Sequence, residues 1–293
     1  MRFTLLLIAC AAALSACSKP DTPSEDQPPA EPATADTGTD VHTAAFIKAV
    51  KQDFATQLVA SASEACGSVK GSDMPDLKSG SPMTYSAAGV IDWGKGQLDY
   101  VHEPGAKIGL VNTRGEGTFS FVVDVHVLAS GQRQYVAGLS QLQNGSLSAS
   151  ITDERDAMAH EGDTSRTRGN LCVGGTTPPA RVTQGMWPLA AKHLQAPGTS
   201  MLCIDPASKS GPVTLAFSFD GKTLQAGDHR FTAADAAHSE TLMIDPVGNT
   251  PGVIYSVNRA DGAGAGIGLP APGVLHYAQL DLPGRGRMMC GRP

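Results

Sequence analysis

Four widely spaced cysteines constrain the fold of this chain more than any other residues. The 293-residue sequence contains six cysteines, and two of these lie in its first 17 residues. The other four are Cys66, Cys172, Cys203 and Cys290. No two cysteines have the Cys-x-x-Cys spacing of common zinc sites, so we do not expect structural zinc. An even number of cysteines in an oxidising compartment predicts two disulfide bonds.

The positions of these cysteines favour one of the three possible pairings. Cys66 and Cys172 bracket one stretch of the chain. Cys203 and Cys290 bracket another, and the segment between the two stretches, residues 176–200, has the composition of a connector. We therefore expect the bonds Cys66–Cys172 and Cys203–Cys290. The main alternative, Cys172–Cys203 with Cys66–Cys290, would knit the chain into a single domain.

Residues 1–17 have the features of an export signal. Arg2 precedes an apolar stretch that runs from Leu5 to Ala13, and the stretch ends in Leu14-Ser15-Ala16-Cys17. This pattern resembles the lipobox of bacterial lipoproteins. The resemblance implies cleavage before Cys17, a diacylglycerol on its sulfur and a fatty acid such as palmitate on its new amine. It covers these residues alone and names no family for the rest of the chain.

Two other interpretations of the N-terminus are less favoured. A plain secretory signal would end in an Ala-x-Ala-like site and would not need the cysteine. A transmembrane helix needs about 20 apolar residues, whereas this run stops near residue 17. We therefore expect a lipid anchor, which holds a protein stably when two or more chains insert. In lipoproteins the residue after the cysteine influences sorting, and Ser18 favours the outer membrane, facing the periplasm.

Composition divides the chain into four parts. Residues 1–16 are the expected signal peptide, and residues 17–41 are the lipidated cysteine with a Pro-rich, disordered tether. Residues 42–180 are expected to form a helix and a β-rich first half, and residues 181–293 a β-rich second half. The net charge of −6 and the absence of a basic stripe argue against a nucleic-acid partner.

The body is expected to be mainly β with one N-terminal α-helix. Only 5% of the residues are aromatic, whereas 33 are Gly and 20 are Pro, which suits a protein rich in strands and turns. Residues 43–65 predict the helix, with Gly67 as its stop and Lys51 outside its apolar stripe. The stripe consists of Phe46, Val50, Phe54 and Leu58.

Alternating apolar residues and turn signals predict antiparallel strands. Thr118–Val127 alternates strictly enough for a strand. Hairpin turns are expected around residues 94–96, at Asn144-Gly145 and at Asp220-Gly221. Thr232 with Asp235 predicts a helical turn that opens with a capping box. The glycines of residues 262–268 predict a flexible loop. The expected architecture is a meander or sandwich, or two barrel-like halves.

Histidines beside carboxylates are weak candidates for a metal or acid–base site. Asp124 and His126 share one face of a predicted strand, and His229 and His238 lie near several carboxylates in sequence. We favour exposed, solvated surfaces for both groups. The acidic segment around His160 lacks the ligand pattern of an EF-hand and predicts a solvated turn. We therefore assign no catalytic residue, metal or cofactor.

The leading functional hypothesis is a non-enzymatic binding protein of the bacterial envelope. It could act as an inhibitor, as an immunity-type protein or as a component of an envelope complex, with an envelope protein as its partner. The alternative is a periplasmic enzyme or metal-binding protein that uses the histidine and carboxylate groups.

Overall fold

The computed structural model describes most of the chain from Thr37 onwards. The described ranges are 37–70, 76–78, 80–103, 106–115, 118–129, 133–141, 146–153, 168–175, 185–205, 211–245 and 252–292. Within them, side chains are not described at 37–42, 69, 114–115, 118–129, 133–134, 153 and 168. Residues 37–293 belong to one compact unit. The expected signal peptide, Cys17 and most of the expected tether lie outside the described residues.

Three helices and eighteen strands make up the described residues. The helices are α1 (Thr37–Gln57), α4 (Trp187–His193) and α5 (Ala233–Ala236). The first nine strands are β1 (Ala60–Lys70), β2 (Met83–Tyr85), β3 (Val90–Asp92), β4 (Gln97–Asp99), β5 (Lys107–Gly115), β6 (Thr118–Ala129), β7 (Arg133–Gln141), β8 (Leu147–Asp153) and β9 (Arg168–Gly175). The other nine are β10 (Ala196–Ile204), β11 (Val213–Phe219), β12 (Leu224–Ala226), β13 (His229–Phe231), β14 (Ser239–Ile244), β15 (Val253–Asn258), β16 (Gly264–Leu269), β17 (Tyr277–Leu282) and β18 (Gly286–Gly291).

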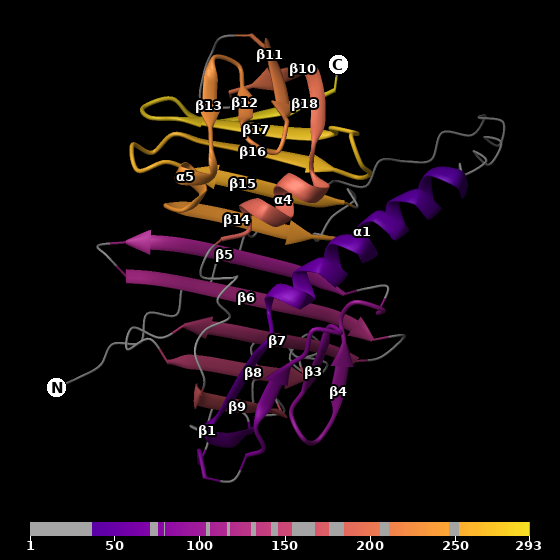
Figure 1. The fold of residues 1–293 in the computed structure, drawn as a ribbon, viewed down its shortest axis with the longest axis vertical. Coiled ribbons are helices and arrows are strands. Elements are labelled where there is room, and N and C mark those ends of the chain that lie inside the picture. Colours follow the sequence, from indigo (N-terminus) through magenta and orange to yellow (C-terminus); the bar gives the residue numbers. More distant parts are fainter. Residues whose placement is uncertain are drawn as a thin grey trace, which may run out of the picture. The chain divides into compact units, whose positions relative to one another are not determined.

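The strands form two modules that share one topology. Followed from neighbour to neighbour, the antiparallel pairings run β4-β3-β2-β1-β9-β8-β7-β6-β5 and then β14-β15-β16-β17-β18-β10-β11-β12-β13. We call residues 37–175 module 1 and residues 185–292 module 2. In each module the first strand pairs with the second and the ninth, and the fifth strand joins the other module (Figure 1). The expectation of a mainly β, antiparallel fold with an N-terminal helix is confirmed.

One continuous row of strand partners crosses both modules. Each residue in the row is the register partner of the next, and each module contributes six. The row reads Cys66, Cys172, Ala149, Leu139, Val123, Leu110, Leu242, Tyr255, Ile267, Ala278, Cys290 and Cys203. Every member whose side chain is described is at most 5% exposed. The row therefore runs through the core from one disulfide bond to the other.

The row gives the chain an approximate two-fold axis. Leu110 of β5 lies opposite Leu242 of β14. Each is the sixth member of the row, counted from the cysteine at its own end of the row. An antiparallel pair of equivalent strands has two-fold symmetry about its central pair. We call the β5–β14 pairing the seam. The two modules are therefore joined as two copies of one subunit would be joined in a symmetric dimer.

The segments that flank the strands are also equivalent. A helix precedes the first strand of each module, and a buried leucine follows it: Leu58 donates its N–H to the Phe54 carbonyl (3.1 Å), and Leu194 donates to the Ala190 carbonyl (2.7 Å). After the fourth strand, each module makes one helical turn. Asp99 opens that turn in module 1, and Thr232 opens it in module 2. Helix, strands and turns thus recur in the same order.

Both disulfide bonds join the first and ninth strands of a module. Cys66 bonds to Cys172, and Cys203 bonds to Cys290, at sequence separations of 106 and 87 residues. This is the pairing that the sequence favoured, and each bond links directly opposite residues of neighbouring strands. In the chain-entropy model, loops of this length are worth about 4.7 kcal/mol each. Each bond therefore holds the first and ninth strands of its module together.

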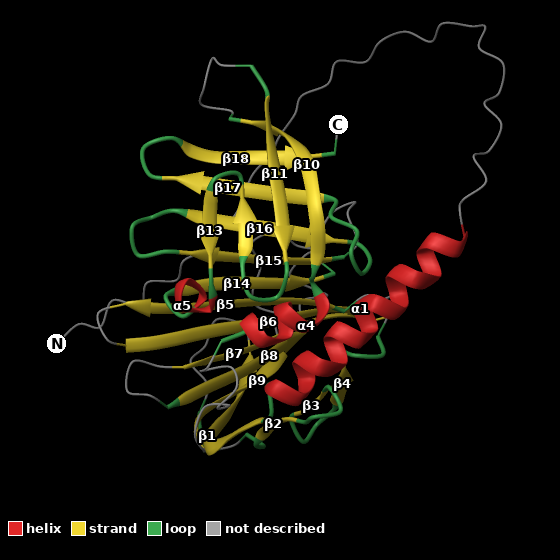
Figure 2. Ribbon diagram, turned by 45° about the horizontal axis from the view of Figure 1, so that its top comes forward, coloured by secondary structure: helices red, strands yellow, loops and turns green. Residues whose placement is uncertain are grey.

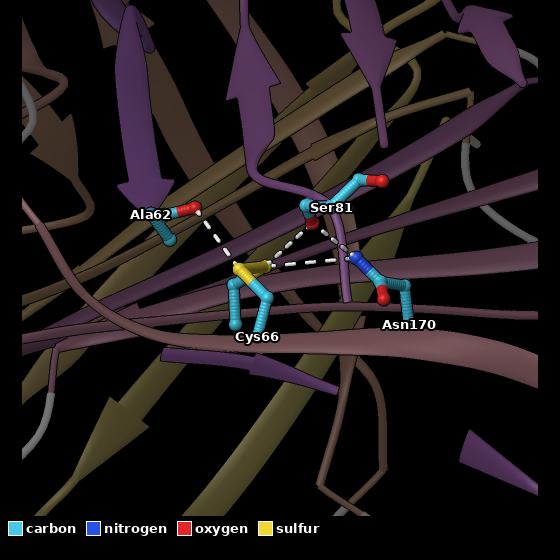
Figure 3. The surroundings of a disulfide bond; sticks show 5 residues. Ala62, Cys66, Ser81 and Asn170 are labelled. Atoms are coloured by element: carbon cyan, nitrogen blue, oxygen red, sulfur yellow. Dashed lines mark hydrogen bonds between the residues drawn. A yellow bond between two sulfur atoms is a disulfide. The ribbon is translucent and has the colours of Figure 1, made fainter. Parts of the chain in front are cut away.

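A loop segment packs against the module 1 disulfide bond (Figure 3). The Ser81 carbonyl oxygen lies 3.1 Å from Cys172 Sγ and accepts a hydrogen bond from Asn170 Nδ2 at 2.7 Å. The Gly80 N–H donates to the Cys66 carbonyl at 2.9 Å. A β-carbon on residue 80 would lie 2.6 Å from the Cys66 carbonyl carbon, so this close approach requires glycine.

Two predictions about the helical and connecting segments are wrong. Helix α1 ends at Gln57 rather than near residue 65, and β1 starts at Ala60 and contains Gly67. Pairing with β9 outweighs the helical pattern here, because it buries Cys66 opposite Cys172. The expected connector, residues 176–200, includes helix α4 and most of β10.

The glycine-rich segment 262–268 is also not a loop. It contributes β16, whose six residues are all buried. Alternation puts the glycines on one face and Ala265, Ile267 and Leu269 on the other. A β-carbon at Gly266 would lie 2.9 Å from Ser256 Cβ, so the missing side chain makes room for the neighbouring strands. Glycine here allows close packing instead of flexibility.

The short-range predictions are confirmed. β3 and β4 flank residues 94–96, and β11 and β12 flank Asp220-Gly221. β7 and β8 pair as the predicted hairpin requires, while Asn144-Gly145 between them lie outside the described residues. β6 covers the predicted strand. Thr232 donates its N–H to Asp235 Oδ2 at 2.7 Å, which makes the predicted capping box at the start of α5.

The equivalence of the two disulfide bonds leads to a stability prediction. Replacing Cys66 and Cys172 by Ser, or Cys203 and Cys290 by Ser, should lower the free energy of unfolding by about 2–5 kcal/mol in each case. Guanidinium chloride unfolding of the oxidised protein, with Cys17→Ser as the common background, measures both losses. Non-reducing peptide mapping is the check on connectivity, and a Cys172–Cys203 peptide would contradict the structure.

Candidate functional site

A buried glutamate links helix α4 to the seam. Glu240 of β14 is 0% exposed and accepts three hydrogen bonds. The Met186 N–H, just before α4, donates to Oε1 at 2.6 Å, and Asn112 Nδ2 of β5 donates to Oε1 at 2.7 Å. The Tyr255 hydroxyl of β15 donates to Oε2 at 2.7 Å. One carboxyl group therefore holds together a helix and three strands of both modules.

Burial changes the protonation of this group. Removal from water raises the pKa of the Glu240 carboxyl, and the hydrogen bonds from Asn112, Tyr255 and Met186 oppose that rise. Burial, and after it the same carboxylate, raises the pKa of Tyr255. A group that no solvent reaches has no contact with a soluble substrate. We therefore assign Glu240 a structural role at the seam.

A buried lysine links helix α1 to the other end of the seam. Lys51 is 2% exposed, and its Nζ donates to the Ala106 carbonyl just before β5. Asp245 Oδ2, just after β14, is 4.0 Å from Nζ. Burial lowers the pKa of Lys51, while the charges of Asp245 and Glu103 raise it. Each module's helix thus makes a buried polar contact near the start of its own fifth strand.

The two helices also meet at the surface (Figure 2). Asp53 of α1 forms ion pairs with Lys192 and His193 of α4, and His193 Nε2 lies 2.5 Å from Asp53 Oδ2. Burial would raise the pKa of Asp53, but hydrogen bonds from Lys192 and His193 outweigh it, so the pKa is lowered. These ion pairs stabilise the contact between the two helices. The three groups offer too few ligands for a metal ion.

The histidines that the sequence singled out lie on different elements or outside the described side chains. Asp124 and His126 lie on β6, where only the backbone is described. His229 lies on β13, whereas His238 is exposed after α5. His160 lies outside the described residues. Within the part of the chain that the structure describes, no three His, Cys, Asp or Glu side chains lie close enough to hold a metal ion.

Sequence reasoning missed the two buried charged groups. Glu240 alternates with Leu242 and Ile244, so strand periodicity alone places it on the buried face of β14. Lys51 is next to Val50 of the apolar stripe, and its burial depends on the position of β5 and β14 around α1. The first signal was readable in the sequence, and the second was not.

Exposed apolar side chains gather on the outside of module 2. Seven large apolar side chains are exposed among the described residues, and three of these, Leu202, Ile204 and Met289, lie on the outer side of the paired strands β10 and β18. They are 38–55% exposed. Ile204 and Met289 are register partners, and the Tyr277 hydroxyl lies 3.5 Å from Met289 Sδ. We call Leu202, Ile204, Tyr277 and Met289 the outer face of module 2.

Module 1 shows that the fold itself does not require this face. The position equivalent to Ile204 in the row beside the disulfide bond is Gly67, and the position equivalent to Leu202 is Ala65. The equivalent of Tyr277 is Ser148. The equivalent of Met289 is Leu171, so the same topology and disulfide bond form with small residues at three of the four positions. Exposed apolar side chains cost solubility, so those of module 2 are the best candidates for a binding surface.

Comparisons with protein-family models, with curated proteins and with solved structures give no match for this chain. Among the described residues, no helix is long and apolar enough to cross a membrane.

Burial of Glu240 predicts a pH-dependent stability. The raised pKa means that the folded chain holds this proton more tightly than the unfolded chain, whose glutamate titrates near the ordinary 4.5. The stabilisation that protonation provides is present below about that pH and is lost as pH rises through the folded pKa. Wild type should therefore lose stability relative to Glu240→Gln as pH rises above 4.5, by about 1.4 kcal/mol per unit of pKa difference. Denaturant unfolding of both proteins from pH 4 to 9 measures this, and parallel curves would contradict it.

Proposed function

We propose that this chain is a lipid-anchored protein of the bacterial outer membrane that faces the periplasm and acts by binding. The anchor is Cys17, in the sequence Leu14-Ser15-Ala16-Cys17 that resembles a lipobox. Two disulfide bonds in the body suit an oxidising compartment. The protein would work as an inhibitor, as an immunity-type protein or as a component of an envelope complex.

The observation that carries the binding function is the outer face of module 2. Ile204 and Met289 expose about half of their apolar surface, whereas the equivalent strands of module 1 pair Gly67 with Leu171. The two modules share one fold but differ in these surface residues. The contacts that maintain the fold therefore do not explain why module 2 exposes apolar side chains. Tyrosine and methionine are enriched where proteins bind their targets.

Replacing the anchor cysteine tests the location. Cys17→Ser removes the sulfur that would carry the diacylglycerol, so the variant should move from the membrane fraction to the soluble periplasmic fraction after a high-salt wash. Cys66→Ser with Cys172→Ser is the matched control, since it removes two cysteines but leaves the anchor. Retention of Cys17→Ser on salt-washed membranes would refute the anchor.

Crosslinking in intact envelopes tests the binding surface. A photo-reactive amino acid at position 204 should give several-fold more adducts, with protein or with lipid, than the same residue at position 111. Val111 is a fair control because it is, like Ile204, an exposed β-branched apolar residue. It is 44% exposed and lies on β5, away from the outer face. Equal yields at the two positions would contradict a binding role for this face.

A further inference from the structure

We propose that the outer face of module 2 binds the surface of a phospholipid bilayer that carries anionic headgroups. This inference rests on the proposed function, because it names the partner of the same surface. It assigns the face to the membrane on which the anchor would hold the chain.

The composition of the face suits a bilayer surface. Leu202, Ile204 and Met289 are exposed apolar side chains on two paired strands, and Tyr277 lies beside them with its hydroxyl at the surface. Aliphatic side chains insert into the boundary between headgroups and acyl chains, and tyrosine favours that boundary because it is apolar with a polar tip. The outer side of β10 and β18 presents these groups together.

Positive charge surrounds the face although the chain as a whole is acidic. The hairpin of β17 and β18 and the residue that follows carry Arg285, Arg287 and Arg292, all exposed, against one aspartate. That aspartate, Asp281, pairs with Arg287 (2.9 Å). A second aspartate, Asp205, directly follows Ile204, so the residues around the face carry a net excess of one positive charge. The net charge of the chain is −6. Basic residues around an apolar surface draw it towards anionic lipid.

The expected tether allows this contact. Nineteen residues (18–36) separate Cys17 from the start of α1, and an extended chain of that length spans roughly 60 Å. Figures 1 and 2 both show the start of α1 on the same side of the body as the end of β18. An anchored chain keeps its body at a high local concentration near the bilayer, so a weak surface contact is enough to orient it.

A second copy of the chain suits the face less well. A symmetric dimer through this face would bring together two identical patches that each carry a net positive charge. Like charges facing each other weaken association. An anionic bilayer complements the same charges.

Vesicle binding of the unlipidated full-length mature chain, Cys17→Ser, tests the proposal. It should co-sediment with vesicles of phosphatidylcholine containing 30% phosphatidylglycerol (roughly the charge density of an anionic membrane) and bind pure phosphatidylcholine at least several-fold more weakly. Adding Ile204→Ser and Met289→Ser should weaken binding about tenfold. Arg285→Gln with Arg292→Gln should remove most of the preference for anionic vesicles, and added salt should do the same.

Two matched variants guard against unfolding as an explanation. Val59→Ser with Val111→Ser removes two exposed valines away from the face and should leave binding unchanged. Ile204→Leu with Met289→Leu keeps the face apolar and should retain binding. Every variant should match the unfolding midpoint of Cys17→Ser, and if the double Ser variant does not, Ile204→Ser alone replaces it.

Two results would overturn the proposal. The first is no preference for anionic over neutral vesicles, or binding that Ile204→Ser with Met289→Ser leaves unchanged. The second is a concentration-dependent dimer, seen by sedimentation, that those substitutions abolish, since it would make the face a contact between copies. Because the assay uses an unlipidated chain, it does not depend on whether Cys17 is an anchor in cells. Failure of the vesicle assay likewise leaves the fractionation result standing.

Discussion

The continuous row of strand partners between the two disulfide bonds is the constraint on which the rest of the structure depends. It crosses twelve strands from Cys66 to Cys203 and passes through the seam at Leu110 and Leu242. Because side chains alternate along a strand, a shift of one residue at any pairing would turn a buried set of side chains outwards. Each disulfide bond fixes the register at one end of the row, where a slip would separate the two sulfur atoms. The two modules can differ in loops and surface and still keep one core.

The buried charged groups Glu240 and Lys51 fix the positions of the helices on this sheet. Glu240 binds the backbone at the start of α4, and Lys51 of α1 binds the backbone before β5. Apolar packing alone lets a helix slide, whereas a hydrogen bond to a buried charged group defines one position, and its loss leaves that group unsatisfied. These two contacts lie at opposite ends of the seam. The seam is therefore both the joint between the modules and the place where both helices are positioned.

A repeated fold offers an internal comparison that a single domain lacks. Where the two modules agree, as in the row and the disulfide bonds, the shared residues maintain the fold. Where they differ at equivalent positions, as Gly67 differs from Ile204, the fold does not explain the difference. Leu202, Ile204 and Tyr277 of module 2 belong to this second class. The bilayer contact that we propose for this face draws on its combination of apolar and basic side chains.

The sequence by itself determined the local features of this protein: the lipobox-like N-terminus, the hairpin turns, the capping box at Thr232, the mainly β composition and a favoured pairing of the cysteines. These depend on residues close together in the chain or on simple counting. It misplaced the end of α1, took residues 262–268 for a loop and left Lys51 on a solvent-facing side. Only the tertiary structure decided these points, and only it revealed the two modules, the seam and the outer face. The physical reason is that strand register and burial come from partners far apart in the chain, such as Cys66 and Cys172 at a separation of 106 residues, whose mutual packing outweighs local preference.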